Sequence, residues 1–236
     1  MKKTLFNYIN KMTLVPVSEW LSDLLAESFL KGYPRKCIHN GIDLNIFTYN
    51  KELFSLFPGK KMVLGVSSVW EPRKGLRDFI GMRSFLGEDY IIILIGLTKK
   101  QIDVLPKGII GIERTNNVQE LVAYYSRADV FVNPTYEDNF PTTNIEALAC
   151  GTPVISYNTG GSPEAIDEHT GMVVPVGNIR CLVNSIAQIC GKKNRDEIRR
   201  NCRQRAERMF NMNDRYQEYV NLYESLLAVN PVEKDA

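Results

Sequence analysis

Short apolar runs alternate with helix-like stretches along most of this chain, and that alternation restricts the fold more than any other feature. Six runs have the length of a strand: residues 62–66, 90–95, 108–111, 130–133, 154–157 and 172–176. Helical stretches are predicted at residues 76–86, 98–104, 117–126, 142–149, 162–168 and 178–190. The run 91–95 is apolar at every position, as expected when helices cover both faces of a parallel sheet. The sequence therefore predicts an α/β fold with a doubly wound parallel sheet, in which ligands bind at the carboxyl ends of the strands.

The amino-terminal part of the chain follows a different pattern. Residues 14–17 predict a short strand, residues 18–25 a capped amphipathic helix, and residues 35–43 another short strand and turn. These elements are too few for an independent domain. Residues 1–45 therefore either pack onto the main domain or are the remnant of a larger domain and its linker.

The carboxy-terminal part contains two further predicted helices. Residues 194–209 are rich in charged side chains, whereas residues 213–229 carry tyrosines and leucines at helical spacing, a stripe that is typical of packing. We assign residues 46–210 to the main domain and residues 211–236 to a carboxy-terminal helix and tail.

Composition and charge argue against several classes of protein. The formal net charge of +2 is too small to indicate nucleic acid as a partner. The longest apolar run, residues 90–97, is far shorter than the roughly 20 residues of a membrane-spanning helix. The basic start of the chain is not followed by an apolar stretch long enough for a signal peptide, so secretion is not expected. Five cysteines without a CxxC pair argue against a disulfide framework and a zinc site, so we expect a cytoplasmic protein.

Two acidic residues, Asp138 and Glu146, lie on either side of a predicted helix start near Pro141. Backbone N–H groups at Thr142 and Thr143 have no acceptor within the helix, and the helix dipole adds positive charge that favours a phosphate. A ligand with phosphate in its middle and hydroxyl groups at both ends fits this pattern. A nucleotide-sugar has that shape.

Asp138 and Glu146 can also be explained by local structure, without a ligand. The segment from Thr143 to Glu146 satisfies the capping-box pattern, in which Glu146 only bonds a backbone N–H at the helix start. Asp138 is also a common turn residue, because aspartate side chains bond the nearby backbone. The pair alone therefore does not establish a ligand site.

Five separated stretches, taken together, resemble the glycosyltransferases of family 4, which have the GT-B fold and retain the configuration of the transferred sugar. They include the Val17-Ser-Glu-Trp-Leu segment, the Asn40-Gly-Ile-Asp turn and the loop that ends in Lys74-Gly75. The remaining two are residues 121–134 and the run from Asn133 that continues through Gly160-Gly161. The resemblance covers about residues 14–190. It implies a Rossmann-like donor-binding domain for residues 46–210 and a remnant of the acceptor-side domain for residues 1–45.

The resemblance also implies roles for the acids, since the family has two acidic residues at the spacing of Asp138 and Glu146. Glu146 matches the acid that binds the ribose hydroxyls, a task that suits a carboxylate. Asp138 matches the acid beside the transferred sugar, where the family usually has Glu. Glu137 is an alternative for that position.

The same resemblance implies how the donor's phosphates are held. Lys74 matches the diphosphate lysine and would neutralise charge on the leaving group, so we predict catalytic roles for Lys74 and Asp138. The family's usual arginine is missing from this loop, and Arg73 is a candidate for its charge. The remaining predicted substrate-binding residues are Asn139, Phe140, Thr142, Thr143 and Glu146.

These matches imply retaining, metal-independent transfer of a sugar from a nucleotide-sugar to a glycan or lipid-linked glycan, with no cofactor. The expected partners are the donor, the acceptor and no nucleic acid; peripheral association with the inner face of the membrane and a separate amino-terminal domain are left open. The alternative is a nucleotide-sugar-binding half of a split or truncated glycosyltransferase, inactive alone. An epimerase or phosphorylase on the same fold is a further alternative, although no lysine is marked for pyridoxal phosphate.

Overall fold

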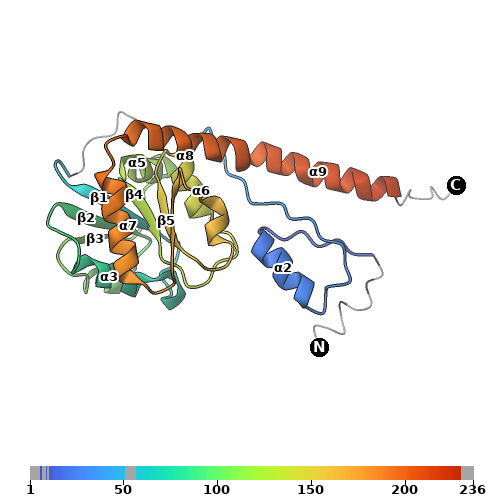
Figure 1. Ribbon diagram of the computed structural model, residues 1–236, viewed down its shortest axis with the longest axis horizontal. Coiled ribbons are helices and arrows are strands. Elements are labelled where there is room, and N and C mark those ends of the chain that lie inside the picture. Colours follow the sequence, from blue (N-terminus) through green and yellow to red (C-terminus); the bar gives the residue numbers. More distant parts are fainter. Residues whose placement is uncertain (1–5, 7–8, 10, 51–56, 230–236) are drawn as a thin grey trace.

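The computed structural model describes Phe6, Ile9 and residues 11–50 and 57–229 (Figure 1). At its centre is a six-stranded parallel sheet in the order β3-β2-β1-β4-β5-β6. Its strands are β1 (Lys61–Val66), β2 (Tyr90–Ile95), β3 (Ile109–Ile112), β4 (Val130–Asn133), β5 (Val154–Tyr157) and β6 (Gly171–Val174). The predicted doubly wound α/β fold is confirmed.

Helices cover both faces of the sheet. Consecutive residues of a strand point to opposite faces of the sheet and belong to two different hydrophobic clusters. Val63 and Ile92 belong to one cluster, and Leu64 and Ile93 belong to the other. The first cluster packs against α3 (Leu76–Arg83) and α7 (Ile179–Gly191), and the second against α5 (Val118–Arg127), α6 (Thr142–Ala149) and α8 (Arg195–Met209). Burial on both faces explains why these strands are continuously apolar in sequence.

Strand β1 lies in the middle of the sheet and separates the two halves of the chain. Val63 pairs with Ile92 of β2 on one side and with Val130 of β4 on the other. After β3 the chain crosses back through α5 and continues on the far side of β1. The strand order therefore reverses between β1 and β4, the position at which sheets of this kind form a ligand crevice.

Several predicted elements are shorter than expected, and one is wrong. Residues 162–168 do not form an α-helix: the 3-10 turn η2 (Ser162–Ala165) ends at Ile166, whose backbone is extended. The helix predicted at 98–104 is reduced to α4 (Lys99–Ile102), and α3 ends at Arg83. Strand β6 starts and ends earlier than predicted, because Pro175 and Gly177, with φ of 73°, turn the chain toward α7.

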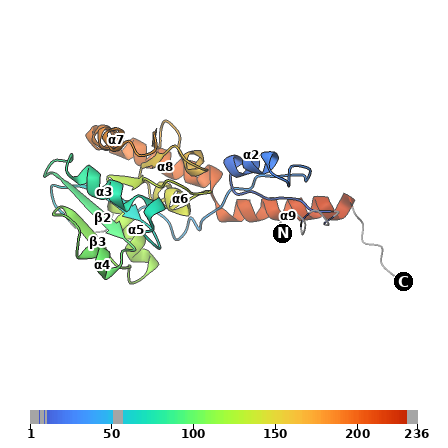
Figure 2. The same ribbon diagram turned by 90° about the horizontal axis from the view of Figure 1, so that it is seen from below.

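Where the structure describes it, the amino-terminal segment contributes no strand to the sheet. The strands predicted at 14–17 and 35–43 reduce to the isolated bridges Leu14–Arg35 and Ile42–Asn211. Helix α2 (Glu19–Glu27) begins as predicted at Ser18, whose side chain accepts a hydrogen bond from the N–H of Leu21. Helix α9 (Met212–Val229) extends away from the sheet, and α2 lies on the same side of the sheet as α9 in both views (Figure 2).

The predicted domain ranges include the segment 51–56 and the tail 230–236, which lie outside the described residues. No helix in the described part of the chain has the length and apolar character needed to cross a membrane.

Candidate functional site

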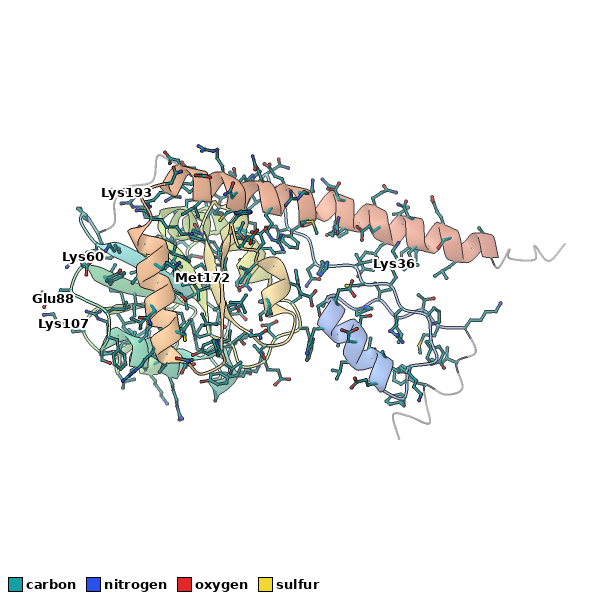
Figure 3. All side chains as sticks on the ribbon, in the orientation of Figure 1. Lys36, Lys60, Glu88, Lys107, Met172 and Lys193 are labelled. Atoms are coloured by element: carbon teal, nitrogen blue, oxygen red, sulfur yellow. The ribbon has the colours of Figure 1, made fainter. Side chains whose placement is uncertain are left out.

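A cavity of about 270 Å³ lies between the carboxyl ends of β1 and β4, where the strand order reverses. Val66 ends β1, Asn133 ends β4, and both line the cavity. Lys60, Glu88 and Lys107 precede β1, β2 and β3 and lie together at the other end of the sheet (Figure 3). The cavity is therefore at the carboxyl edge, as the sequence predicts for ligands of this fold.

Helix α6 begins at the wall of the cavity. Pro141 is its N-cap and Thr142 its first residue, so proline precedes the helix by one position rather than starting it. Thr142 and Thr143 both line the cavity. The N–H groups of a first helical turn have no acceptor within the helix, and together with the helix dipole they favour an anion.

Lys74 and Asp138 meet inside this cavity. Lys74 ends the 3-10 turn η1 (Pro72–Lys74) after β1, and Asp138 lies in the loop after β4. Lys74 Nζ donates to Asp138 Oδ2 at 2.5 Å, and the two side chains are only 21% and 16% exposed. The structure thus brings both predicted catalytic residues together as an ion pair.

Gly75 makes this approach sterically possible. Its φ is 74°, and a Cβ atom there would lie 2.2 Å from the carbonyl oxygen of Pro134. The Lys74 loop therefore contacts the backbone that follows β4 directly. A side chain at this position would separate the two loops.

Glu146 does not form the capping box that its spacing also allowed. No side chain caps α6, and Glu146 Oε2 instead accepts a hydrogen bond of 2.9 Å from the Tyr125 hydroxyl of α5. Burial raises the pKa of the Glu146 carboxyl, while hydrogen bonds from Tyr125 and Thr142 act in the opposite direction. The carboxylate is therefore held in a half-buried position by groups that leave it further acceptor capacity.

The remaining predicted residues lie in different surroundings. Phe140 lines the cavity, but its ring packs 4.8 Å from that of His39 and is 4% exposed, so only its backbone is available to a ligand. Asn139 is exposed and does not line the cavity. Arg73 also lies outside the lining; it donates to Glu71 Oε2 at 2.9 Å and to the carbonyl of Glu137 at 3.1 Å.

Glu137, the alternative first acid, is exposed and takes no part in the lining, in contrast to Asp138. The arrangement therefore favours Asp138 as the acid beside a ligand in the cavity.

The sequence did not indicate Ser67, Ser68 and Trp70 as site residues, although they form one wall of the cavity. Trp70 is held by its Nε1–H, which donates to the carbonyl of Ile95 at 2.9 Å. The departure of this loop from the family pattern was the available signal. Ser67 Oγ donates to the carbonyl of Val69 at 2.8 Å, and the Trp70 ring packs edge-on against that of Phe79, so neighbouring groups hold both side chains in place.

Among the residues that the structure describes, no three His, Cys, Asp or Glu side chains gather in a way that could hold a metal ion. The charged groups that line the cavity are Lys74 and Asp138.

Comparison with known proteins decides the family of this chain. Residues 60–192, more than half of the sequence, match the family described as Glycosyl transferases group 1. The chain belongs to this family. The group 1 glycosyltransferase match includes β1, Lys74, Asp138 and the whole of α6, so the cavity described above lies entirely within it.

Relatives of this group 1 glycosyltransferase domain include enzymes of polysaccharide and glycoside synthesis. The capsular polysaccharide biosynthesis glycosyltransferase CapM of Staphylococcus aureus is 29% identical over 113 residues, which are 47% of this chain and 30% of CapM. The D-inositol 3-phosphate glycosyltransferase of Streptomyces bingchenggensis is 48% identical over 60 residues, 25% of this chain and 13% of that protein.

Solved structures share the fold. Sucrose-phosphate synthase from Thermosynechococcus elongatus superposes with a TM-score of 0.84 at 22% identity, covering 97% of this chain and 61% of that one. HepE of Anabaena, solved in complex with UDP-glucose, gives a TM-score of 0.76 at 19% identity, covering 89% of this chain and 63% of HepE. The chain thus spans less than two thirds of these proteins, and its match covers under a third of CapM.

Proposed function

We propose that this chain is the donor-binding part of a retaining glycosyltransferase of family 4, which transfers a sugar from a nucleotide-sugar to a glycan or lipid-linked glycan. The observation that carries the proposal is the convergence of Lys74, Asp138 and the first turn of α6 on one cavity at the reversal of the strand order. The family match supports it. So does the complex of HepE with UDP-glucose on the same fold.

In this proposal the diphosphate lies between Lys74 and the N–H groups of Thr142 and Thr143. The bond between the sugar's anomeric carbon and the diphosphate oxygen breaks, and the diphosphate leaves with the electron pair. The acceptor hydroxyl attacks from the same face, which retains the configuration, and its proton passes to the leaving diphosphate. Lys74 and the helix dipole supply positive charge where negative charge develops, so the proposed transfer requires no metal ion.

The two acids hold the ends of the donor. Asp138 contacts hydroxyl groups of the transferred sugar, and Glu146 accepts hydrogen bonds from the ribose. Because Tyr125 fixes the Glu146 carboxylate, little rotational freedom is lost when the ribose binds. We place the reaction in the cytoplasm, with peripheral association at the inner face of the membrane if the acceptor is lipid-linked.

A second candidate function is nucleotide-sugar binding without independent transfer. The observation in its favour is that the described lining residues of the cavity all lie between residues 66 and 143, so donor binding there does not depend on an acceptor-binding domain. In such a split enzyme the donor would bind this chain, and transfer would require a separate amino-terminal domain that holds the acceptor. Positioning of two reactants supplies a large part of the rate, so its loss would leave binding intact.

Titration calorimetry with a panel of UDP-, GDP- and ADP-sugars tests the proposal. We expect one class of nucleotide-sugar to bind the wild type, and Glu146→Gln to weaken that binding about tenfold or more, because hydrogen bonds to a charged group are lost. The control is Glu88→Gln, which changes an exposed acid at the opposite end of the sheet and should bind as the wild type does. The proposal fails if no member of the panel binds the wild type.

The pH dependence of the same titration tests the role of Glu146. Burial raises the pKa of this carboxyl, so it becomes protonated at a higher pH than an exposed glutamate would. Nucleotide affinity should therefore fall as the pH is lowered through this raised pKa, and the Glu146→Gln variant should lack that part of the dependence. An identical pH profile in the variant would exclude a binding role for the carboxylate.

A further inference from the structure

A buried acid lies behind the Lys74 loop, outside the cavity. Asp78 is in the first turn of α3 and is 6% exposed. Its Oδ1 atom accepts a hydrogen bond of 3.2 Å from the hydroxyl of Tyr136. Burying a carboxylate is unfavourable unless it is well paired, so packing alone gives no reason for an acid at this position.

Tyr136 belongs to the loop that carries Asp138. Its backbone N–H donates to the carbonyl of Arg73 at 2.7 Å, directly before Lys74, and its own carbonyl accepts from the hydroxyl of Thr159 at 2.9 Å. The side chain thus bonds α3 while the backbone bonds the Lys74 loop and the loop after β5. Tyr136 is therefore one of the residues that join these segments, and the one that adds a bond to α3.

Tyr157 completes the cluster from β5. Its ring packs edge-on against that of Tyr136, with centroids 5.6 Å apart. The Tyr157 hydroxyl and Asp78 Oδ2 are buried without a hydrogen-bond partner among the described residues. Burial raises the pKa of the Asp78 carboxyl, while the phenols of Tyr136 and Tyr157 act in the opposite direction. A small shift would let Tyr157 donate to the free oxygen, giving Asp78 one phenol for each oxygen.

We propose that Asp78 and Tyr136 are positioning residues, which hold the Lys74 and Asp138 loops at the separation that donor cleavage requires. This inference rests on the proposed function, because it assumes that the separation of the Lys74 and Asp138 loops matters for donor cleavage. Neither side chain lines the cavity, so both act through Lys74 and Asp138. Rates of positioned reactions fall steeply when the geometry loosens, whereas binding spread over a helix start and several side chains is less sensitive.

Tyr136→Phe removes only the hydroxyl group and keeps the ring against Tyr157. The matched control is Tyr223→Phe, which removes a hydroxyl from an exposed tyrosine of α9. Hydrogen–deuterium exchange of the ligand-free proteins is measured first. We expect faster exchange in residues 134–140 of Tyr136→Phe and no change in the control. Unchanged exchange in that loop would overturn the inference whether or not the protein binds a nucleotide.

The second measurement uses UDP and UDP-glucose as probes. For Tyr136→Phe we expect UDP affinity within about threefold of the wild type, and release of UDP from UDP-glucose by hydrolysis slowed about tenfold or more. A parallel loss of affinity and rate, or no loss of rate, would contradict a positioning role. If the wild type binds neither probe, the exchange measurement still decides whether Tyr136 holds the loop, and the failure then belongs to the choice of donor or to the proposed function.

A double-variant cycle shows whether Asp78 and Tyr136 act through their shared hydrogen bond or independently of each other. Asp78→Asn retains an acceptor for the Tyr136 hydroxyl, so it should keep most of the protection of residues 134–140. Asp78→Ala should resemble Tyr136→Phe, and the double variant Asp78→Ala/Tyr136→Phe should be hardly worse than either single one. Additive increases in exchange would show that the two residues act separately, which would contradict the inference.

Discussion

Asp138 and Lys74 carry opposite charges inside the cavity, and their contact decides what the cavity offers to an anion. The Lys74 ammonium already has one carboxylate 2.5 Å away, so a bound diphosphate must share it. The family usually has Glu at this position, and the shorter Asp138 side chain keeps its carboxylate close to its own backbone. Binding of a second anion must weaken or break this ion pair, and that loss reduces the net free energy of anion binding.

Removing the charge of Asp138 should therefore have opposite effects on binding and on reaction. In Asp138→Asn the lysine is free for the diphosphate, and we expect UDP to bind several-fold more tightly, by about 1 kcal/mol. Hydrolysis of UDP-glucose should slow about tenfold or more, because the variant alters the contact that we propose between Asp138 and the transferred sugar. The control Asp89→Asn removes an exposed partner of Lys61 and should change neither. Weaker UDP binding by Asp138→Asn would show that the pair does not compete with the ligand.

At the scale of elements, the Lys74 turn reaches the β4 loop only because Gly75 has no side chain. Gly75 and Gly59 both have positive φ, 74° and 76°, but their surroundings differ. A Cβ atom at Gly75 would lie 2.2 Å from the carbonyl oxygen of Pro134, whereas no heavy atom of the described residues lies within 4 Å of one at Gly59. A substitution at Gly59 would therefore introduce backbone strain alone, whereas one at Gly75 would introduce both strain and a steric clash.

Gly75→Ala should lower the free energy of unfolding by about 3 kcal/mol or more, since it combines left-handed strain with a backbone clash. Gly59→Ala carries the strain alone and should cost about 1 kcal/mol. Urea denaturation of both variants measures the difference. Equal losses would mean that the Lys74 turn moves away from Pro134 without cost, and that its close approach is not required.

At the scale of the whole molecule, the Glu164 side chain links the amino-terminal helix α2 to the main domain. Glu164 in η2 accepts hydrogen bonds of 2.9 Å from the N–H groups of both Glu19 and Trp20 at the start of α2, and its Oε2 lies 2.7 Å from His39 Nε2. In the same loop, the N–H of Gly161 donates to the carbonyl of Asp138 at 3.1 Å. The placement of α2 and the Asp138 loop therefore depends on one connected segment.

Glu164→Ala should lower the free energy of unfolding by about 1–2 kcal/mol, because the first N–H groups of α2 lose their acceptor. Hydrogen exchange should become faster in residues 19–27. Glu168→Ala is the control, since that side chain is 86% exposed in the following turn. Unchanged exchange in α2 would show that contacts other than Glu164 fix this helix.

Local sequence patterns were sufficient for most elements of the sheet. The apolar runs of β1, β2, β4 and β5 and the start of α6 were predicted within a residue or two, because periodicity and proline placement are properties of neighbouring residues. The prediction was wrong at residues 162–168, where a helix was predicted but the chain turns after one 3-10 segment. The site residues stay predictions, although the structure places Lys74, Asp138, Phe140, Thr142 and Thr143 on one cavity.

The sequence by itself determined the alternating α/β pattern, the helix start beside Asp138 and the spacing of Asp138 and Glu146, since each depends on residues close along the chain. Only the tertiary structure decided that β1 and β4 are neighbours, and with them Lys74 and Asp138. It also decided that Glu146 bonds Tyr125 rather than capping its own helix, and that Arg73 contacts Glu71 outside the cavity. The physical reason is that strand order and side-chain partners follow from burial over the whole sheet, which no local pattern encodes.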